Sequence, residues 1–379
     1  MFPTRRITTS GGDVFRDEFS LAFDGTDDFI EIPQQTHALA SSNFSYVFWV
    51  KRNVTNAAHN ILGHTASGSK HIRFSSDGFL QIETNTSGDL ATGVLSINDT
   101  NWHHYAVVVG GGNGTVSMYQ DGVSISVTSP DIGDSFSFKR IGQQGDGRYF
   151  NGNISEIAIY NKALLASEIK TIYNGREPYN HKEGVCSSNL QDWWRMGDGV
   201  LDTQPSNHTN SLLISDNTNA TKGSNLWTET YSSNTGSWTA DGTNSLTQEN
   251  NAIKITGDGS DSDGARIRLR STHDLSSDLT VGKLYELTFK SKVSSGSSVN
   301  VQFQISNAHS FVNFVNYTTE YKQFRHYFIA TDATEAEIKC SAMGDGEIIF
   351  MKDFSVREIN GNAGVGQNFD GSDIVGDTP

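Results

Sequence analysis

Cysteine is scarce in this chain of 379 residues, which contains only Cys186 and Cys340. The two lie far apart, and neither belongs to a Cys-x-x-Cys pair or to a cysteine and histidine cluster. This excludes a disulfide framework and a zinc site, and we expect two buried or half-buried thiols. Long apolar runs are missing as well. No stretch approaches the ~18 apolar residues of a membrane span, and no apolar segment follows Arg5 and Arg6 as in a signal peptide.

Basic residues are outnumbered by acidic ones, with 28 Lys and Arg against 43 Asp and Glu and a formal net charge of −15. Because nucleic-acid binding depends on Lys and Arg neutralising the phosphates, this balance argues against a nucleic-acid partner. Coiled-coil heptads and collagen repeats are also absent, so the chain brings no fibrous shaft. We expect a homo-oligomer that forms through folded faces or through the terminal segments.

Aromatic residues and glycine are plentiful, with 21 Phe, 12 Tyr, 6 Trp and 37 Gly. Short segments of alternating apolar and polar residues follow one another, separated by Gly and Asp turns, as in antiparallel sandwiches. One segment, 165–173, has helical spacing, with Leu165, Ile169 and Ile172 on one face. The sequence therefore predicts an all-β protein: two jelly-roll sandwiches in tandem, one short peripheral helix and extended terminal arms.

The pattern changes along the chain define five segments. Trp193 and Trp194 fall in the third, where they either stack on sugar or complete the first core, and burial of large aromatic rings favours the core. The last segment holds too little apolar surface to order itself, so we expect both arms to gain order by contacting a larger assembly. The segments are an arm (1–17), a first sandwich (18–178), a connector packing on it (179–225), a second jelly roll (226–358) and a Gly/Asp-rich tail (359–379).

Five blocks of the first sandwich carry a family resemblance. They are residues 19–32 (FSLAFDGTDDFIEI), 44–51 (FSYVFWVK), 99–108 (DTNWHHYAVV), 118–122 (MYQDG) and 150–169 (FNGNISEIAIYNKALLASEI). In this order they resemble the laminin-G-like branch of the concanavalin A-like lectin/glucanase superfamily. The resemblance implies a jelly roll that serves as a binding module, in some members with calcium.

Two blocks of the second unit, 275–289 (LSSDLTVGKLYELTF) and 346–356 (GEIIFMKDFSV), resemble carbohydrate-binding modules of families 4 and 9. The whole arrangement is similar to virion structural proteins of tailed, especially marine, bacteriophages. The resemblance to virion proteins is an analogy of fold and arrangement, and such an analogy does not by itself determine function.

Catalysis by a jelly-roll glucanase would need two carboxylates close together on one face. In that family they stand as Glu-x-Asp-x-x-Glu on a single strand, and this chain has no such triplet, so we predict no enzyme. His103 and His104 are neighbours on an expected strand and point to opposite faces, so they cannot chelate one ion. Calcium fits better, because it takes carboxylate and backbone oxygens at turns. The resemblance implies Asp24, Asp28 and Glu156 as candidate ligands, since they belong to blocks that can lie close together in such sandwiches. The alternative is that these carboxylates accept hydrogen bonds from turn amides.

Glycan binding needs planar side chains to stack on sugar and polar groups to bind its hydroxyls. Two sets of residues offer such groups, although each is also compatible with a solvated surface. The first set is a loop and the second lies on strands of the second unit, where Arg side chains at alternate positions share a face. The sets are Gln143, Gln144, Asp146, Arg148 and Tyr149, and Arg266, Arg268, Arg270, Gln302 and Gln304.

These features favour a non-enzymatic bacteriophage virion structural protein, in capsid decoration or in a tail or fibre, with jelly rolls that bind glycan or the host surface. Its partners are then other virion proteins, contacted through the terminal arms, and cell-surface glycan. With no signal peptide visible, we expect assembly in the host cytoplasm. A free secreted bacterial lectin is the alternative, and a glycan hydrolase or lyase the third possibility.

Overall fold

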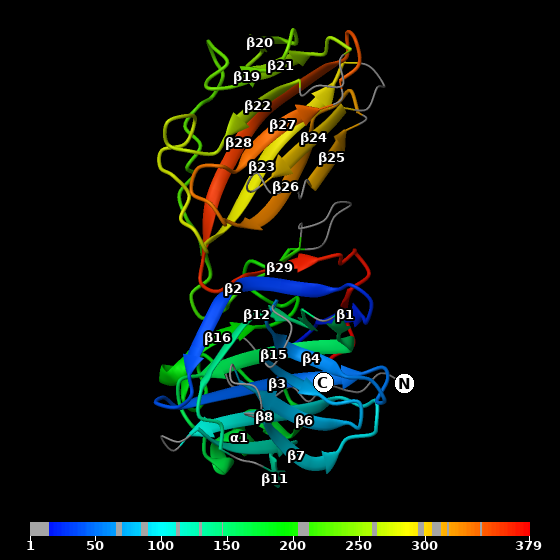
Figure 1. Ribbon diagram of the computed structural model, residues 1–379, viewed down its shortest axis with the longest axis vertical. Coiled ribbons are helices and arrows are strands. Elements are labelled where there is room, and N and C mark those ends of the chain that lie inside the picture. The colour runs from blue at the N-terminus through cyan, green and yellow to red at the C-terminus, as the bar shows by residue number, and fades with distance from the viewer. Residues whose placement is uncertain are drawn as a thin grey trace.

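The protein forms two β-sandwiches stacked along its long axis, called here the first and the second sandwich (Figure 1). This computed structural model confirms the predicted all-β class with tandem jelly rolls. It describes residues 15–65, 70–84, 90–110, 114–128, 131–145, 147–203, 212–259, 264–294, 299–304, 312–316, 318–341 and 343–379. The side chains of residues 299–300, 304, 312–316 and 341 are outside the description.

One sheet of the first sandwich is built around β3 and is called the β3 sheet. As the sequence predicts, β3 is central and buried on both faces, with Phe48 in the main core and Val47 under the helix. In order, its described strands are β10 (Val123–Ile125), β9 (Thr115–Gln120), β8 (His103–Gly110), β3 (Phe44–Arg52), β15 (Asn151–Tyr160), β1 (Ser20–Asp24) and β30 (Ile374–Val375), with β16 (Leu190–Trp194) also paired to β15.

The facing sheet is called the β12 sheet. A hairpin of β13 (Gln143–Gln144) and β14 (Arg148–Tyr149) follows β12. Apolar side chains of both sheets interdigitate between them, as expected for an aligned sandwich. In order, its described strands are β11 (Val127–Thr128), β7 (Leu90–Ser96), β6 (Phe79–Glu83), β5 (His71–Phe74), β4 (His59–Gly63), β12 (Ser135–Ile141), β2 (Phe29–Ala38), β29 (Gly364–Gln367) and β17 (Leu213–Ile214).

The predicted helix is α1 (Ala166–Tyr173), and it packs on the outer face of the β3 sheet. Ile169 and Ile172 are buried as expected, whereas Leu165 is the N-cap and is exposed. The helix ends at Asn174, whose left-handed φ of 50° allows its N–H to bond Lys170 O. Two 3-10 turns follow, η1 (Asn174–Arg176) and η2 (Ser187–Asn189).

The connector contributes core, as the sequence favours. Trp194 is fully buried between the sheets, and Trp193 is buried beside α1. Both lie on β16, which pairs with the C-terminal half of β15, from Ile157 to Tyr160. The two tryptophans therefore form part of the first sandwich and offer no sugar platform.

The C-terminal segment corrects an expectation. The sequence predicts a tail that orders only against a larger assembly, but β29 pairs with β2 and β17, and β30 pairs with β1. Figure 1 shows the red strand β29 beside blue β2, and the pairing of Val375 with Ser20 brings the end of the chain next to β1. The apolar surface missing from the tail is supplied by the first sandwich, where Val365 and Phe369 are buried. The first sandwich is thus built from two separated stretches of sequence.

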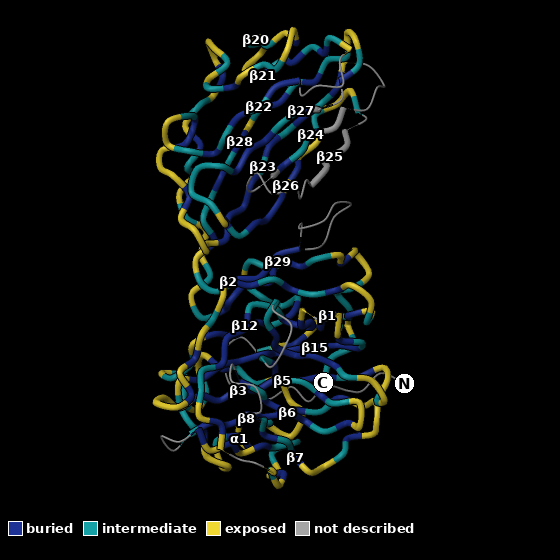
Figure 2. Tube along the Cα trace, viewed as in Figure 1, coloured by how far each residue is buried: buried dark blue, intermediate teal, exposed yellow. Residues whose placement is uncertain are grey.

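The second sandwich lies in sequence between β17 and β29. Its β28 sheet and β27 sheet enclose a core of its own, seen as a second buried centre in Figure 2. The described strands of the β28 sheet are β20 (Ser245–Glu249), β21 (Ala252–Thr256), β28 (Ile348–Asn360), β23 (Leu284–Val293), β26 (Lys322–Ile329) and β18 (Thr221–Lys222). Those of the β27 sheet are β19 (Thr239–Ala240), β22 (Ala265–Arg268), β27 (Glu337–Ser341), β24 (Val299–Gln304) and β25 (Val312–Asn316).

The two connections between the sandwiches run side by side, because β18 pairs with the end of β28. A small apolar cluster joins the sandwiches there, and it includes Leu213 and Val365 from the first and Leu284, Tyr327 and Ile359 from the second. Both cysteines are as expected, with Cys340 buried in the second core and Cys186 half-buried.

Candidate functional site on the second sandwich

The predicted arginines lie on the outer face of the β27 sheet. Along β22, Ala265 and Ile267 enter the core, so Arg266 and Arg268 point outward by strand alternation. Arg266 stands opposite Lys339 of β27, and Arg268 stands opposite Glu337. Strand alternation predicts the shared face of the arginines. The two β27 residues were not predicted, although their alternation with buried Ile338 and Cys340 could have shown them.

The predicted glutamines extend the same rows onto β24. Gln302 stands opposite Lys339, and the backbone of Gln304 stands opposite Glu337. Gln302 lies between Val301 and Phe303, which are both buried in the core, so its side chain points outward. We call the set Arg266, Arg268, Gln302, Glu337 and Lys339 the arginine face.

Ion pairs connect this face to neighbouring carboxylates. Arg266 Nη2 lies 3.4 Å from Asp241 Oδ1, and Arg268 Nη1 lies 3.2 Å from Glu335 Oε2. Arg268 Nε is also 3.8 Å from Glu337 Oε2, and Glu337 is almost completely buried. The carboxyl group of Glu337 thus lies within ion-pair distance of the Arg268 guanidinium.

A cavity of about 170 Å³ opens at the β19 edge of this sheet. Arg270, the third predicted arginine, reaches it from the segment that follows β22. Its Nε donates to His273 Nδ1 at 2.9 Å. Burial and the neighbouring Arg270 lower the pKa of His273, which keeps the ring neutral near pH 7 and its Nδ1 free to accept. The lining residues are Thr239, Arg266, Ile267, Arg268, Arg270 and His273.

The segment that carries Arg270 and His273 is firmly anchored by Asp274. One carboxylate oxygen of Asp274 accepts from the Ser237 N–H at 2.9 Å, and the other accepts from the Tyr231 hydroxyl at 3.1 Å. Tyr231 in turn accepts from the indole N–H of Trp238 at 2.9 Å, inside the core. This chain of hydrogen bonds pre-organises the cavity wall, which reduces the entropy that a ligand must remove on binding.

The loop set of the first sandwich is arranged differently from the prediction. Gln143 and Gln144 are buried on β13, where Arg140 Nη1 donates to Gln143 Oε1, so they are not available on the surface. Arg148 is exposed and Tyr149 half-buried on β14. Asp146 lies outside the described residues. The sequence could not show this, because a two-strand hairpin folding onto a sheet buries polar residues that a loop would expose.

The acidic candidates divide between two places. The carboxylates of Asp24 and Asp28 come together with that of Asp27, their oxygens lying within 4.8 Å of one another. Asp28 Oδ2 accepts from the Asp24 N–H at 2.9 Å, and Asp24 Oδ1 accepts from the Thr26 N–H at 2.7 Å. These bonds match the turn-amide alternative, and calcium binding at this turn stays a prediction.

Glu156, the third metal candidate, is not part of that group in the described chain. It is buried against β16, where it accepts from the Trp193 indole N–H and from Arg195 Nε at 3.0 Å. Burial raises the pKa of Glu156, and burial together with neighbouring Glu156 raises the pKa of Asp17 well above its usual range. The ring of Phe15 packs against the two residues that bind Glu156: the Arg195 guanidinium lies 4.5 Å from the centre of the Phe15 ring, and the Trp193 ring centre lies 5.7 Å from it.

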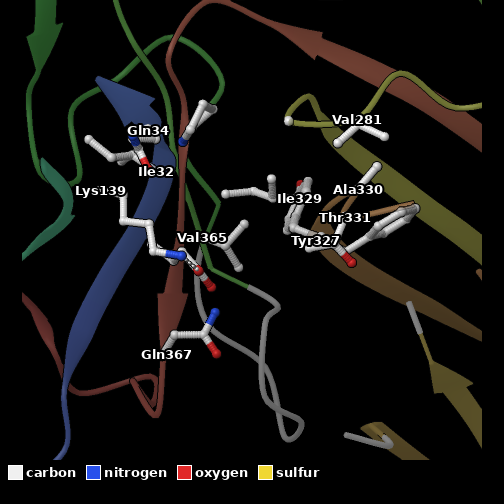
Figure 3. Close-up of a pocket in the computed structure, with 14 residues that line it drawn as sticks. Ile32, Gln34, Lys139, Val281, Tyr327, Ile329, Ala330, Thr331, Val365 and Gln367 are labelled. Atoms are coloured by element: carbon white, nitrogen blue, oxygen red, sulfur yellow. Dashed lines mark ion pairs between the residues drawn. The ribbon is translucent and has the colours of Figure 1, made fainter. Parts of the chain in front are cut away.

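A second cavity, of about 370 Å³, lies where the two sandwiches meet (Figure 3). It was not predicted, because its walls come from opposite ends of the chain and no local pattern connects them. Apolar side chains such as Ile32, Val365 and Ile329 form its floor, and Lys139 pairs with Glu31 at its rim, 3.7 Å away. This cavity continues the apolar cluster that joins the sandwiches.

Comparison with known proteins agrees with the architecture of the first sandwich. The family described as the concanavalin A-like lectin/glucanases superfamily matches residues 24–170. Residues 24–170 are therefore similar in sequence to this superfamily. The matched stretch contains the acidic turn at Asp24–Asp28 and the β13–β14 hairpin. It ends within α1, before the connector strands and the C-terminal strands that complete the sheets.

Several solved structures are similar to this chain in fold. One is a protein from Bacteroides ovatus described as carbohydrate-binding, with 17% identity and a TM-score of 0.40. The alignment covers 53% of this chain, and this chain spans 56% of that protein. A pentraxin of Limulus polyphemus has 18% identity and a TM-score of 0.33. The alignment covers 43% of this chain and 85% of the pentraxin. Domain 4 of an arabinanase from Geobacillus stearothermophilus, solved with arabinotriose, has 24% identity and a TM-score of 0.32, covering 41% and 76%.

No curated protein sequence matches the chain. Over the part of the chain that the structure describes, none of the helices has the length and apolar character needed to span a membrane.

Proposed function

We propose that this protein is a non-enzymatic carbohydrate-binding protein, and that the arginine face of the second sandwich is its glycan site. The observation that carries the proposal is the placement of five polar side chains from three strands on one outward face, beside a pre-organised cavity. Their guanidinium, ammonium and amide groups are the donors that bind sugar hydroxyls and ring substituents.

A binding role is supported over a catalytic one by the state of the buried acids. Asp17 and Glu156 are neighbouring buried carboxylates whose pKa values are both raised, as a glycosidase acid would need. Both are nearly inaccessible, because Phe15, Trp193 and Arg195 surround them. A glycosidic bond could not reach them without displacing the segment before β1. We propose that this pair is structural.

The test is retention by polysaccharides in native affinity gels, comparing the full chain with a double variant, Arg266→Ala with Arg268→Ala. We expect at least one polysaccharide to retard the wild type and not the double variant. Lys290→Ala is the matched control, since Lys290 lies on the other sheet of the same sandwich, paired with Asp353 at 2.8 Å. Equal retardation of all three proteins would show that this face is not the site.

The biological setting is a separate proposal. Attachment to a bacteriophage particle is suggested by the resemblance of the chain's arrangement, and secretion as a free bacterial lectin is the alternative. The C-terminal segment lends the particle role no support, since it pairs with the first sandwich of its own chain. Mass spectrometry of purified particles and of culture supernatant from the native source distinguishes the two settings.

A further inference from the structure

Three arginines line the cavity beside the arginine face. The guanidinium groups of Arg266, Arg268 and Arg270 contribute to its wall together with the neutral imidazole of His273, and among the described residues no carboxylate does. The chain as a whole carries a net charge of −15. A wall of this kind in so acidic a protein needs a specific explanation, because like charges that converge repel one another unless something neutralises them.

The neutralising groups inside the protein lie elsewhere. Arg266 and Arg268 are paired with Asp241 and Glu335, which do not line the cavity. Within the described residues, Arg270 has no carboxylate within 4.0 Å. Its Nε is instead held by His273 Nδ1. Its Nη2 lies 3.3 Å from His273 Nε2, so within the described residues both printed contacts of the Arg270 guanidinium are with a neutral ring and none is an ion pair.

The chemistry of the wall also discriminates between kinds of sugar. A neutral pyranose is recognised largely by stacking on an aromatic ring, and none of the described residues that line this cavity has a six-membered aromatic ring. Guanidinium groups instead match the planar oxygens of a carboxylate, or the oxygens of a sulfate, through paired N–H donors. A volume of about 170 Å³ can hold such a group and part of a ring, since a cavity of ~150 Å³ accepts benzene.

We infer that the second sandwich binds acidic saccharides, and that Arg266, Arg268 and Arg270 receive the carboxylate or sulfate group in this cavity. The inference rests on the proposed glycan binding and names its ligand class. The Asp274 anchor keeps Arg270 and His273 in place before the ligand arrives. His273 acts as a positioning residue, because it holds the guanidinium of Arg270.

The test is calorimetric titration of the full chain with three related oligosaccharides: a galacturonic acid trimer, its carboxyl-reduced neutral counterpart and a sulfated galactan oligomer. We expect at least one acidic sugar to bind at least tenfold more tightly than the neutral one, with an affinity that falls as salt rises. Arg270→Ala should weaken acidic binding by about 10- to 100-fold, the usual effect of losing a charge-assisted hydrogen bond. The uronate and sulfate arms show which anionic group is preferred.

Matched variants keep the result interpretable. Arg270→Gln preserves the length and polarity of the side chain, so it should fold normally and lose acidic binding like Arg270→Ala. Arg270→Lys should recover part of the affinity, because it restores the charge without the paired donors. His273→Ala should weaken acidic binding less than Arg270→Ala does, and Lys290→Ala should not change it.

Each other outcome would overturn the inference in a recognisable way. Equal or tighter binding of the neutral trimer would refute the acidic ligand class and leave the proposed function intact. Binding of inorganic sulfate without any saccharide would indicate an adventitious ion only, and both proposals would fail. Failure of all three sugars, together with no retention in polysaccharide gels, would also refute both. Acidic binding that survives both Arg270→Ala and Arg270→Gln would place the anionic group at another site.

Discussion

Trp194 donates its indole N–H to the backbone carbonyl of Asn362 at 2.8 Å, although 168 positions separate them. This bond joins the strand before the second sandwich to the point where the chain returns from it. Next to it, the side-chain amide of Asn362 donates to Asp192 Oδ1, and Trp193 N–H donates to Asp216 Oδ1 at 3.0 Å. The two crossings of the chain are thus fastened to the first sandwich by buried polar groups.

Trp194→Phe should lower the free energy of unfolding of the first sandwich by about 1–3 kcal/mol, because it leaves the Asn362 carbonyl without its donor in a buried place. Denaturant titration followed by intrinsic fluorescence measures the change. Trp49→Phe is the control, since it removes the same ring volume on β3, away from the crossings. Equal losses in both variants would show that the ring volume, and not the bond to Asn362, accounts for the effect.

Deletion of residues 361–379 should destabilise the first sandwich while leaving the second one folded. The deletion exposes the edges of β1 and β2 and removes Phe369, whose buried ring alone is worth about 3–5 kcal/mol. Differential scanning calorimetry should show one transition moving to lower temperature and one staying in place. If both transitions of the truncated protein stayed at the temperatures of the full chain, the C-terminal strands would not be part of the fold.

Single glycines in the C-terminal segment give a sharper version of this test. A Cβ at Gly364 would lie less than 3.0 Å from Ile30, and one at Gly366 would lie less than 3.0 Å from Leu212. Gly366→Ala should therefore cost about 1–3 kcal/mol through overpacking. Gly371→Ala, where a Cβ would meet nothing within 4 Å, is the matched control and should leave the unfolding free energy unchanged. Similar stabilities for the two variants would argue against the tight approach of β29.

The ionisation of Asp192 should lower the free energy of unfolding of the first sandwich as the pH rises. Burial, and then the charge of Asp216, raise the pKa of Asp192 to about 7 from an ordinary 3.8. Between about pH 4 and pH 7 the folded protein holds a proton that the unfolded chain has released, so the free energy of unfolding falls with pH over that window. Asp192→Asn should remove this contribution, which amounts to about 2–3 kcal/mol between pH 5 and pH 8.

The measurement is the urea midpoint of the wild type and of Asp192→Asn at pH 5 and pH 8. The amide can still accept from Asn362, so the variant should fold and should gain stability relative to the wild type only at the higher pH. Asp77→Asn, at an exposed turn, serves as the control. Parallel pH profiles for the wild type and Asp192→Asn would contradict a raised pKa.

Local sequence patterns were sufficient for much of this fold. Strand alternation showed that β3 is central and that Arg266 and Arg268 share a face, because both features depend on neighbouring residues alone. The burial of Trp193 and Trp194 also followed from residue type. The glycines of 361–371 were misleading. Glycine is frequent in disordered tails, but here it permits close packing against Ile30 and Leu212, and composition alone does not separate the two cases.

Long-range pairings were the part that could not be predicted. The insertion of the second sandwich depends on β29 meeting β2 and β30 meeting β1, which no local pattern records. The same reason hid the cavity between the sandwiches and the burial of Glu156 against Trp193 and Arg195. For the candidate site, the sequence provided the arginines and glutamines. It did not provide Glu337 beneath Arg268, or the Asp274 anchor, which both depend on how separate strands come together.

The most direct test of glycan binding at the arginine face is a crystal structure of the protein with the oligosaccharide that it retains best. The sugar should lie across β22, β27 and β24, with polar atoms within hydrogen-bonding distance of Arg268 and Gln302. A sugar bound at the β13–β14 hairpin or in the cavity between the sandwiches, with the arginine face unoccupied, would contradict the account.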